Sequence, residues 1–167
     1  MRKLLPIGLT LVFLLAACAG EDPAVNGSQG SGGEDHGMGM GDEGFAFGEP
    51  GDQGEADRTI EVSAFDSLEF DPDSVEVESG ETVTFAVTNE GKNVHEFVLG
   101  DESYQEDHAV EMSAGEDMRM GLNEIEIEPR ETKSLTWTFT DADNVLYGCH
   151  EPGHYEGGMV GMAELGS

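Results

Sequence analysis

Residues 82–88 read TVTFAVT, and in this run Val83, Phe85 and Val87 alternate with threonine and other small residues. An alternation of period two places one set of side chains on each face of a β-strand. Comparable short runs occupy residues 59–64, 74–78, 95–99, 125–127, 135–139, 145–149 and 160–165. About eight short strands, each with one apolar face, predict an all-β chain folded as a β-sandwich.

Residues 101–121 break this pattern. Ala109, Met112 and Met118 are compatible with one or two helical turns, which Ser113-Ala114-Gly115 interrupts. The methionines, Met120 included, are predicted to form the apolar side of a short helical excursion that covers the sandwich. The alternative is a surface for soft metal ions, formed by the methionines together with His108.

The first residues have the features of an export signal. Arg2 and Lys3 precede an apolar run over residues 4–17, which is too short to cross a bilayer. The run ends in Leu15-Ala16-Ala17-Cys18, which resembles the lipobox of bacterial-type lipoproteins. The resemblance implies a signal peptide over residues 1–17 and a lipidated Cys18, so that lipid alone holds the exported protein to the extracytoplasmic side of the membrane. The alternative is an ordinary secretory signal followed by an incidental cysteine.

Residues 18–56 form a segment rich in Gly, Asp and Glu, with too little apolar surface for a core, which predicts a disordered tether. It contains His36-Gly37-Met38-Gly39-Met40, which is either a weak site for soft metal ions or, more simply, low-complexity sequence. Phe45 and Phe47 predict that residues 44–51 dock on the folded domain, which is expected to span residues 57–167.

The chain carries 36 acidic residues against 7 basic ones, for a net charge of −29. Nucleic-acid binding is excluded because it depends on the neutralisation of phosphates by Lys and Arg. The same charge disfavours an electrostatic attachment to anionic membranes. The acidity is interpreted either as steering of a basic partner or as adaptation to high salt.

The chain has only two cysteines, Cys18 and Cys149. If Cys18 carries lipid, Cys149 has no disulfide partner within the chain. An exported protein rarely keeps an exposed free thiol, so Cys149 is expected to be buried, nucleophilic or bound to a metal.

Residues 147–162 read YGCHEPGHYEGGMVGM and contain Cys149, His154 and Met159 at regular spacing. A second imidazole, His95, lies far upstream. A thiolate, two imidazoles and a thioether suit copper, and this is the ligand set of blue-copper sites, with Met as the weak axial ligand. The Gly and Pro residues of the segment allow it to fold back so that His154 and Met159 reach the same ion.

On these residues the chain resembles the cupredoxins, the family of plastocyanin, azurin, amicyanin and rusticyanin, over roughly residues 58–165. Gly158-Met159-Val160-Gly161 is similar to the axial-methionine segment of plastocyanins, and the Cys-x4-His-x4-Met spacing is similar to the ligand loop of rusticyanin. Residues 70–72, 75–77 and 80–85 are similar to the early strands of the family. The resemblance implies a Greek-key sandwich that holds one type 1 copper ion.

By position, the resemblance implies His95, Cys149 and His154 in the trigonal plane and Met159 as the axial ligand. His95 has a competing role as a hydrogen-bonded core residue, and Cys149 as a small buried hydrophobe. Two departures from the family pattern are Glu96, where many members have Asn or Ser, and His150 directly after the cysteine.

Two other residues compete for ligand positions. His150 competes with His154, but neighbours in an extended segment point to opposite faces. Met162 competes with Met159, and Met159 is favoured because Met162 would point away on a strand.

The predicted function is one-electron transfer by a monomeric, lipid-tethered copper protein, with a redox partner that docks near His154 through a basic surface. The alternative is copper sequestration or delivery without a dedicated electron-transfer role. An enzyme is not expected: a binuclear copper centre needs a second cysteine in the loop, and multicopper oxidases need more histidines than the five present. A Cys/His hydrolase would need an oxyanion arrangement that the sequence does not indicate.

Overall fold

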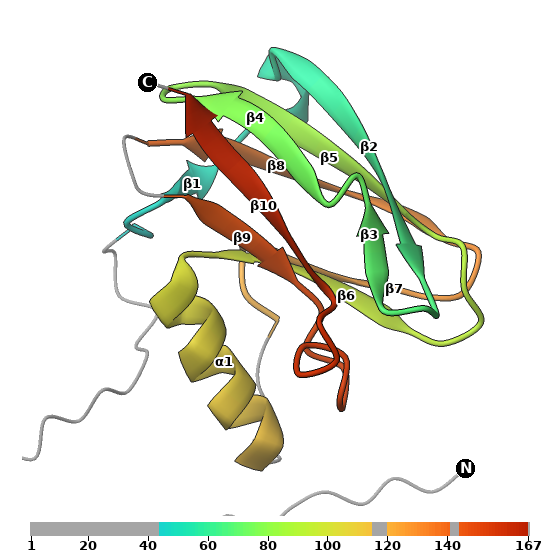
Figure 1. Ribbon diagram of the computed structural model, residues 1–167. Helices are drawn as coiled ribbons and strands as arrows, with labels where there is room; N and C mark the ends of the chain where they lie inside the picture. The colour runs from blue at the N-terminus through green and yellow to red at the C-terminus, as the bar shows by residue number, and fades with distance from the viewer. Residues whose placement is uncertain (1–43, 115–119, 141–143, 167) are drawn as a thin grey trace, which may run out of the picture. The chain divides into compact units, whose positions relative to one another are not determined.

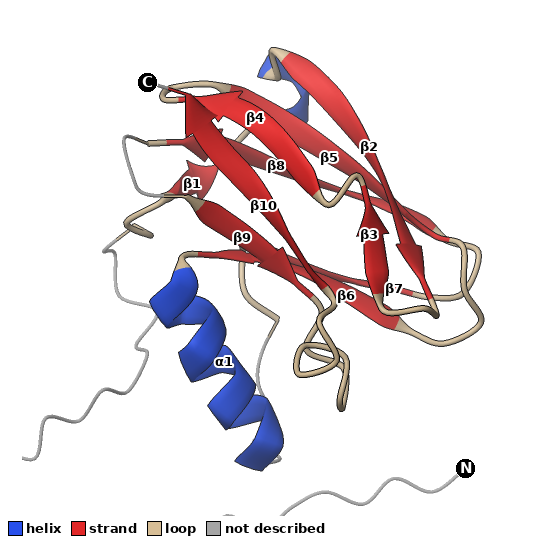
Figure 2. Cartoon of the chain, in the orientation of Figure 1, coloured by secondary structure: helices blue, strands red, loops and turns tan. Residues whose placement is uncertain are grey.

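The computed structural model describes residues 44–114, 120–140 and 144–166. Strands are the main regular secondary structure of this part of the chain (Figure 2). The elements are β1 (Gly48–Pro50), η1 (Gln53–Glu55), β2 (Arg58–Phe65), β3 (Glu69–Asp71), β4 (Ser74–Glu78), β5 (Thr82–Asn89), β6 (His95–Gly100), α1 (Glu102–Ala114), β7 (Glu124–Ile127), β8 (Thr132–Phe139), β9 (Val145–Gly148) and β10 (Val160–Gly166). The export signal, Cys18 and residues 36–40 lie outside the described residues.

The strands form two five-stranded sheets, in the orders β1-β8-β5-β2-β3 and β4-β10-β9-β6-β7 (Figure 1). The chain passes repeatedly from one sheet to the other, and the apolar faces of the two sheets pack together. The predicted all-β sandwich is confirmed. The two strands that the alternation did not predict, β1 and β3, have three residues each, too few to show a period, and both lie at edges of the first sheet. No helix among the described residues is long and apolar enough to span a bilayer.

The central strand β5 shows how the sequence pattern builds the sandwich. Val83, Phe85 and Val87 are fully buried between the sheets. On the other face, threonines of β5 pair with threonines of β8, with hydroxyl oxygens 2.8 Å apart for Thr84 and Thr136. Such cross-strand pairs stabilise the register of neighbouring strands.

The segment before the first long strand docks on the domain, as Phe45 and Phe47 predicted. Phe47 is buried and stacks on Trp137 with ring centroids 5.4 Å apart, and β1 pairs with β8. A side chain at Gly48 would meet the Trp137 indole and the Thr138 carbonyl, so only glycine permits this close approach.

Helix α1 is longer than the one or two turns that the sequence predicted, although it ends where Ser113-Ala114-Gly115 indicated. Asp101 caps its start, because Asp101 Oδ1 accepts a hydrogen bond from the Tyr104 backbone N–H at 2.8 Å. The helix covers β6 and β9, and the residues it buries are polar: Gln105 and His108. The pattern of apolar residues missed the full helix because its buried face is not an apolar stripe.

The methionines do not form the predicted apolar side of this helix as a group. Met112 is half-buried and Met120 is 55% exposed beyond the end of the helix, while Met118 lies outside the described residues.

Candidate metal centre

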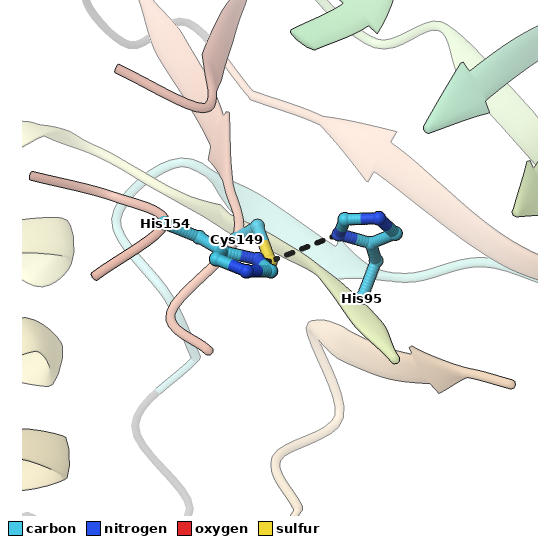
Figure 3. Close-up of side chains that lie close together, drawn as sticks. All are labelled: His95, Cys149 and His154. Carbon is cyan, nitrogen blue, oxygen red and sulfur yellow. Dashed lines mark hydrogen bonds between the residues drawn. The ribbon is translucent and has the colours of Figure 1, made fainter. Parts of the chain in front are cut away.

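Three separate positions bring sulfur and nitrogen donors together at one end of the second sheet. His95 is the first residue of β6, Cys149 directly follows β9, and His154 lies in the loop between β9 and β10. Cys149 Sγ is 3.3 Å from His154 Nδ1 and 3.8 Å from His95 Nδ1 (Figure 3). The three donor atoms lie within 4.8 Å of one another. Cys149 and His95 are fully buried, whereas His154 is partly exposed.

Backbone hydrogen bonds hold the loop that carries these donors. The Cys149 N–H donates to the Met159 carbonyl at 3.1 Å, and the Met159 N–H donates to the His154 carbonyl at 3.0 Å. Gly153 and Gly158 adopt φ angles of 83° and 96°, which glycine reaches without strain. Met159 is fully buried, and its backbone is thus tied to both loop donors.

Glu96 braces the cysteine loop at the position where a family resemblance predicts Asn or Ser. Its backbone N–H donates to Cys149 Sγ at 3.3 Å. Its carboxylate also accepts a hydrogen bond from the His150 backbone N–H. The replacement therefore keeps the link between β6 and the loop, although it places a carboxyl group near the site. Burial, followed by the charges of Glu151 and Glu124, raises the pKa of Glu96 to about 7.

The orientation of His95 depends on residues that the sequence did not single out. Asp66 Oδ1 lies 3.4 Å from His95 Nε2 and also accepts hydrogen bonds from the backbone N–H groups of Lys92 and Asn93. Those backbone hydrogen bonds lower the pKa of Asp66. A carboxylate behind a ligating imidazole fixes its tautomer and leaves the other nitrogen, here Nδ1, free to bind a metal. No sequence signal marks Asp66, because its partners lie in a distant turn.

Asn89 supports the same turn from the end of β5. Its side-chain amide donates to the carbonyl oxygens of Asn93 and Ile127 at 2.7 and 2.9 Å, and its Oδ1 accepts from the Gly91 N–H. This buried side chain fixes the path of the chain just before His95.

The electrostatics of the centre favour neutral donors when no cation is bound. Burial raises the pKa of the Cys149 thiol to about 11, although N–H groups of Glu96 and Glu151 lower it in part. Burial, then the charge of His154, lowers the pKa of His95, while Asp66 acts in the opposite direction. A soft cation that displaces the thiol proton suits this donor set, because thiolate and imidazole are the ligands that copper prefers.

The two competing residues lie elsewhere. His150 points away from Cys149, and its Nε2 is 2.6 Å from Gln105 Oε1 beneath α1. Met162 is the third residue of β10, where it is half-buried between the inward-facing Gly161 and Ala163. The structure thus brings together His95, Cys149 and His154 and leaves His150 and Met162 apart.

A two-sheet sandwich with one cysteine and two histidine donors at the end of a sheet defines a cupredoxin. The family model for copper-binding proteins of the plastocyanin/azurin family matches residues 56–166. The chain therefore belongs to the plastocyanin/azurin family of copper-binding proteins, and copper is its cofactor.

Named relatives and solved structures agree with this assignment. The chain is 34% identical to a copper-resistant cuproprotein, CopI, of Pseudomonas aeruginosa, over 96% of both chains. It is 37% identical to the protein of the same name from Rubrivivax gelatinosus, over 96% of this chain and 95% of the relative. In fold it is similar to the auracyanin of Roseiflexus castenholzii, with a TM-score of 0.58 and 24% identity over 67% of this chain and 99% of that one.

Proposed function

We propose that this protein holds one type 1 copper ion and carries single electrons. His95 Nδ1, Cys149 Sγ and His154 Nδ1 are the trigonal ligands, and Met159 is the axial one. The observation that carries the proposal is the Cys149 thiol placed between two imidazoles whose Nδ1 atoms both face it. Copper in such a site supplies reversible one-electron chemistry.

Contacts with surrounding residues hold the ligand side chains in place in the metal-free protein. Asp66 orients His95, Glu96 holds the cysteine loop through its N–H and its carboxylate, and the loop is closed by its own backbone hydrogen bonds. A site held rigidly by supporting contacts changes little between oxidation states. Because His95 is fully buried and His154 is partly exposed, the imidazole of His154 is the edge through which an electron passes to a partner.

Titration of Cu²⁺ into the apo-protein tests the proposal. The expected result is an intense visible absorption band from thiolate-to-copper charge transfer, which saturates at one ion and disappears on reduction. A colourless copper complex would contradict the proposal.

Copper handling is the second candidate, because two relatives are named copper-resistant cuproproteins. The two functions differ in what leaves the protein. A carrier of electrons exchanges them rapidly with a redox mediator and keeps its copper through many cycles. A sequestering or delivering protein loses Cu⁺ to a competing chelator after reduction. Stopped-flow measurement of electron exchange, with copper analysis of the recovered protein, separates the two.

The proposed place of action is outside the cytoplasmic membrane, with lipid on Cys18 as the anchor. The support is the apolar run over residues 4–17 that ends in Leu15-Ala16-Ala17-Cys18. Cells fed a radioactive fatty acid should label the wild-type protein, and Cys18→Ala should abolish the label. Fatty-acid labelling that persists in Cys18→Ala would contradict the proposal that Cys18 carries the lipid anchor.

The proposed partner is a redox protein with a basic docking surface, and the protein acts as a monomeric carrier rather than as an enzyme. The net charge of −29 supports electrostatic steering of such a partner. Association with a cationic redox protein should slow as ionic strength rises. A rate that is independent of salt would instead favour adaptation of the acidic surface to a saline environment.

A further inference from the structure

A second pair of histidines lies buried beneath α1, apart from the centre described above. His108 comes from α1, and His150 follows Cys149. Their side chains are 3% and 4% exposed, and their rings meet edge to face with centroids 4.6 Å apart. Tyr155 stacks on His150 at 4.4 Å and holds its ring in place. Neither histidine has a role in the proposed electron transfer.

The contacts of Gln105 determine where the proton of His150 lies. The Gln105 side-chain NH₂ group donates to the carbonyl oxygens of Val98 and Leu146 at 2.8 and 3.3 Å. Its Oε1 therefore faces His150 Nε2, at 2.6 Å, and can only accept a hydrogen bond. The His150 proton is thus on Nε2, and Nδ1 carries a free lone pair.

His108 faces a carboxylate rather than an amide oxygen, at a distance too long for a hydrogen bond. Its Nε2 is 3.7 Å from Glu124 Oε2. An ionised carboxylate oxygen is an acceptor only, so it favours the tautomer of His108 that carries the proton on Nε2. Nδ1 of His108 is again the atom left with the lone pair. The same relation holds at the first centre, where Asp66 lies behind His95 Nε2 and His95 Nδ1 faces the donor cluster.

Both Nδ1 atoms are buried without a hydrogen-bond partner. A buried acceptor without a partner destabilises the folded protein, and such groups call for a bound water or ion. Two unpartnered imidazole nitrogens thus lie in one buried contact between α1 and the segment that follows β9.

We propose that His108 Nδ1 and His150 Nδ1 bind a second copper ion as Cu²⁺. Imidazole donors suit divalent metals of intermediate softness, and Cu²⁺ binds most tightly among the first-row ions. Glu124 and Gln105 act as the groups that orient the two rings, as Asp66 does for His95. The inference does not depend on the role proposed for Cys149, since the two sites share no donor atom.

The test titrates Cu²⁺ into the full-length apo-protein while both visible absorption and electron paramagnetic resonance are recorded. The expected result is a second bound ion with nitrogen hyperfine coupling from two imidazoles and without a thiolate absorption band. The chain has five histidines. Once His95 and His154 are occupied, only His36, His108 and His150 remain as imidazole donors.

Three variants assign the signal. His108→Phe and His150→Phe keep an aromatic ring in the packed position, and each should abolish two-imidazole coupling of the second ion. His36→Ala is the matched control and should leave that coupling unchanged. The thiolate absorption band of the first ion reports that each variant is folded. If the wild-type protein shows no such band, that result counts against the copper site at Cys149 and not against the second site.

Two results would overturn the inference. One is saturation of the wild-type protein at a single copper ion. The other is a second ion whose imidazole coupling survives in both phenylalanine variants or disappears in His36→Ala. Zn²⁺ serves as a competitor, and displacement of the second Cu²⁺ by equimolar Zn²⁺ would also reject the assignment to copper.

Discussion

The two histidine pairs of this protein share their imidazole arrangement and differ in what lies between the rings. The ring centroids are 5.1 Å apart for His95 and His154 and 4.6 Å apart for His108 and His150. In each pair one ring has a carboxylate behind its Nε2, at 3.4 Å for Asp66 and 3.7 Å for Glu124. The first pair faces the Cys149 thiol, the only cysteine among the described residues.

The adjacent residues Cys149 and His150 explain how one loop serves both pairs. Neighbouring side chains of an extended segment point to opposite faces, so Cys149 faces β6 and His150 faces α1. The comparison indicates that the sulfur, rather than the histidines, distinguishes the site proposed for electron transfer from the second pair. The second pair offers imidazole nitrogens without a sulfur donor, which suits copper held as Cu²⁺.

The largest predicted effect comes from removing that sulfur. Cys149→Ser should abolish the visible charge-transfer band entirely, because the band requires a copper–thiolate bond. His108→Phe, in the other pair, should leave the band unchanged. Absorption spectra of the two copper-loaded variants provide the measurement, and a band that persists in Cys149→Ser would break the distinction between the pairs.

The carboxylate behind His95 provides the next largest effect. Asp66→Asn should lower copper affinity at the first site by about 10- to 100-fold, because the imidazole loses its charged orienting partner. Competition with a calibrated chelator gives the affinity. Glu90→Gln, which alters an exposed ion pair with Arg130 at 3.5 Å, is the matched control and should change little. Equal losses in the two variants would show that Asp66 has no special role.

Gly148, which lies between the two histidine pairs, leaves no room for an added methyl group. A Cβ at Gly148 would lie 2.7 Å from Gln105 Oε1 and 2.9 Å from Tyr155 Cδ2, both of which support His150. Gly148→Ala should destabilise the protein by about 1–3 kcal/mol, because these packed side chains must shift. Chemical denaturation measures the change. At Gly44 nothing lies within 4 Å of an added Cβ, so Gly44→Ala should stay within about 0.5 kcal/mol of the wild type.

The two sites should also differ in the protons that they release. At pH 7 the Cys149 thiol is protonated, since its pKa is raised to about 11, so the first ion displaces a proton and binds more tightly as pH rises. Burial, then the charge of His108, lowers the pKa of His150 to about 4, so its Nδ1 is already free at pH 7. Calorimetry in buffers of different ionisation enthalpy should therefore detect proton release for the first ion only. Equal release for both ions would contradict this difference.

Much of the fold was predictable because its signals are local. The alternation in residues 82–88 predicted β5 and its buried face, and the spacing of Cys149, His154 and Met159 marked a metal-ligand loop. The strands β1 and β3 were too short to show a period. The full length of α1 was missed because its buried residues, Gln105 and His108, are polar.

The supporting residues of the sites were not predictable, because their partners are distant in sequence. Asp66 acts on His95 across a turn, and Gln105 acts on His150 from a helix that the chain reaches much earlier. The sequence analysis considered His150 only as a competitor of His154. Its contact with His108 becomes visible only when α1 is placed against β9.

The most direct test of the central claim is a copper X-ray absorption spectrum of the protein loaded with one equivalent of copper. The account predicts a short copper–sulfur bond together with scattering from two imidazoles, because Cys149, His95 and His154 converge on one point. A first coordination shell of nitrogen and oxygen alone would contradict it.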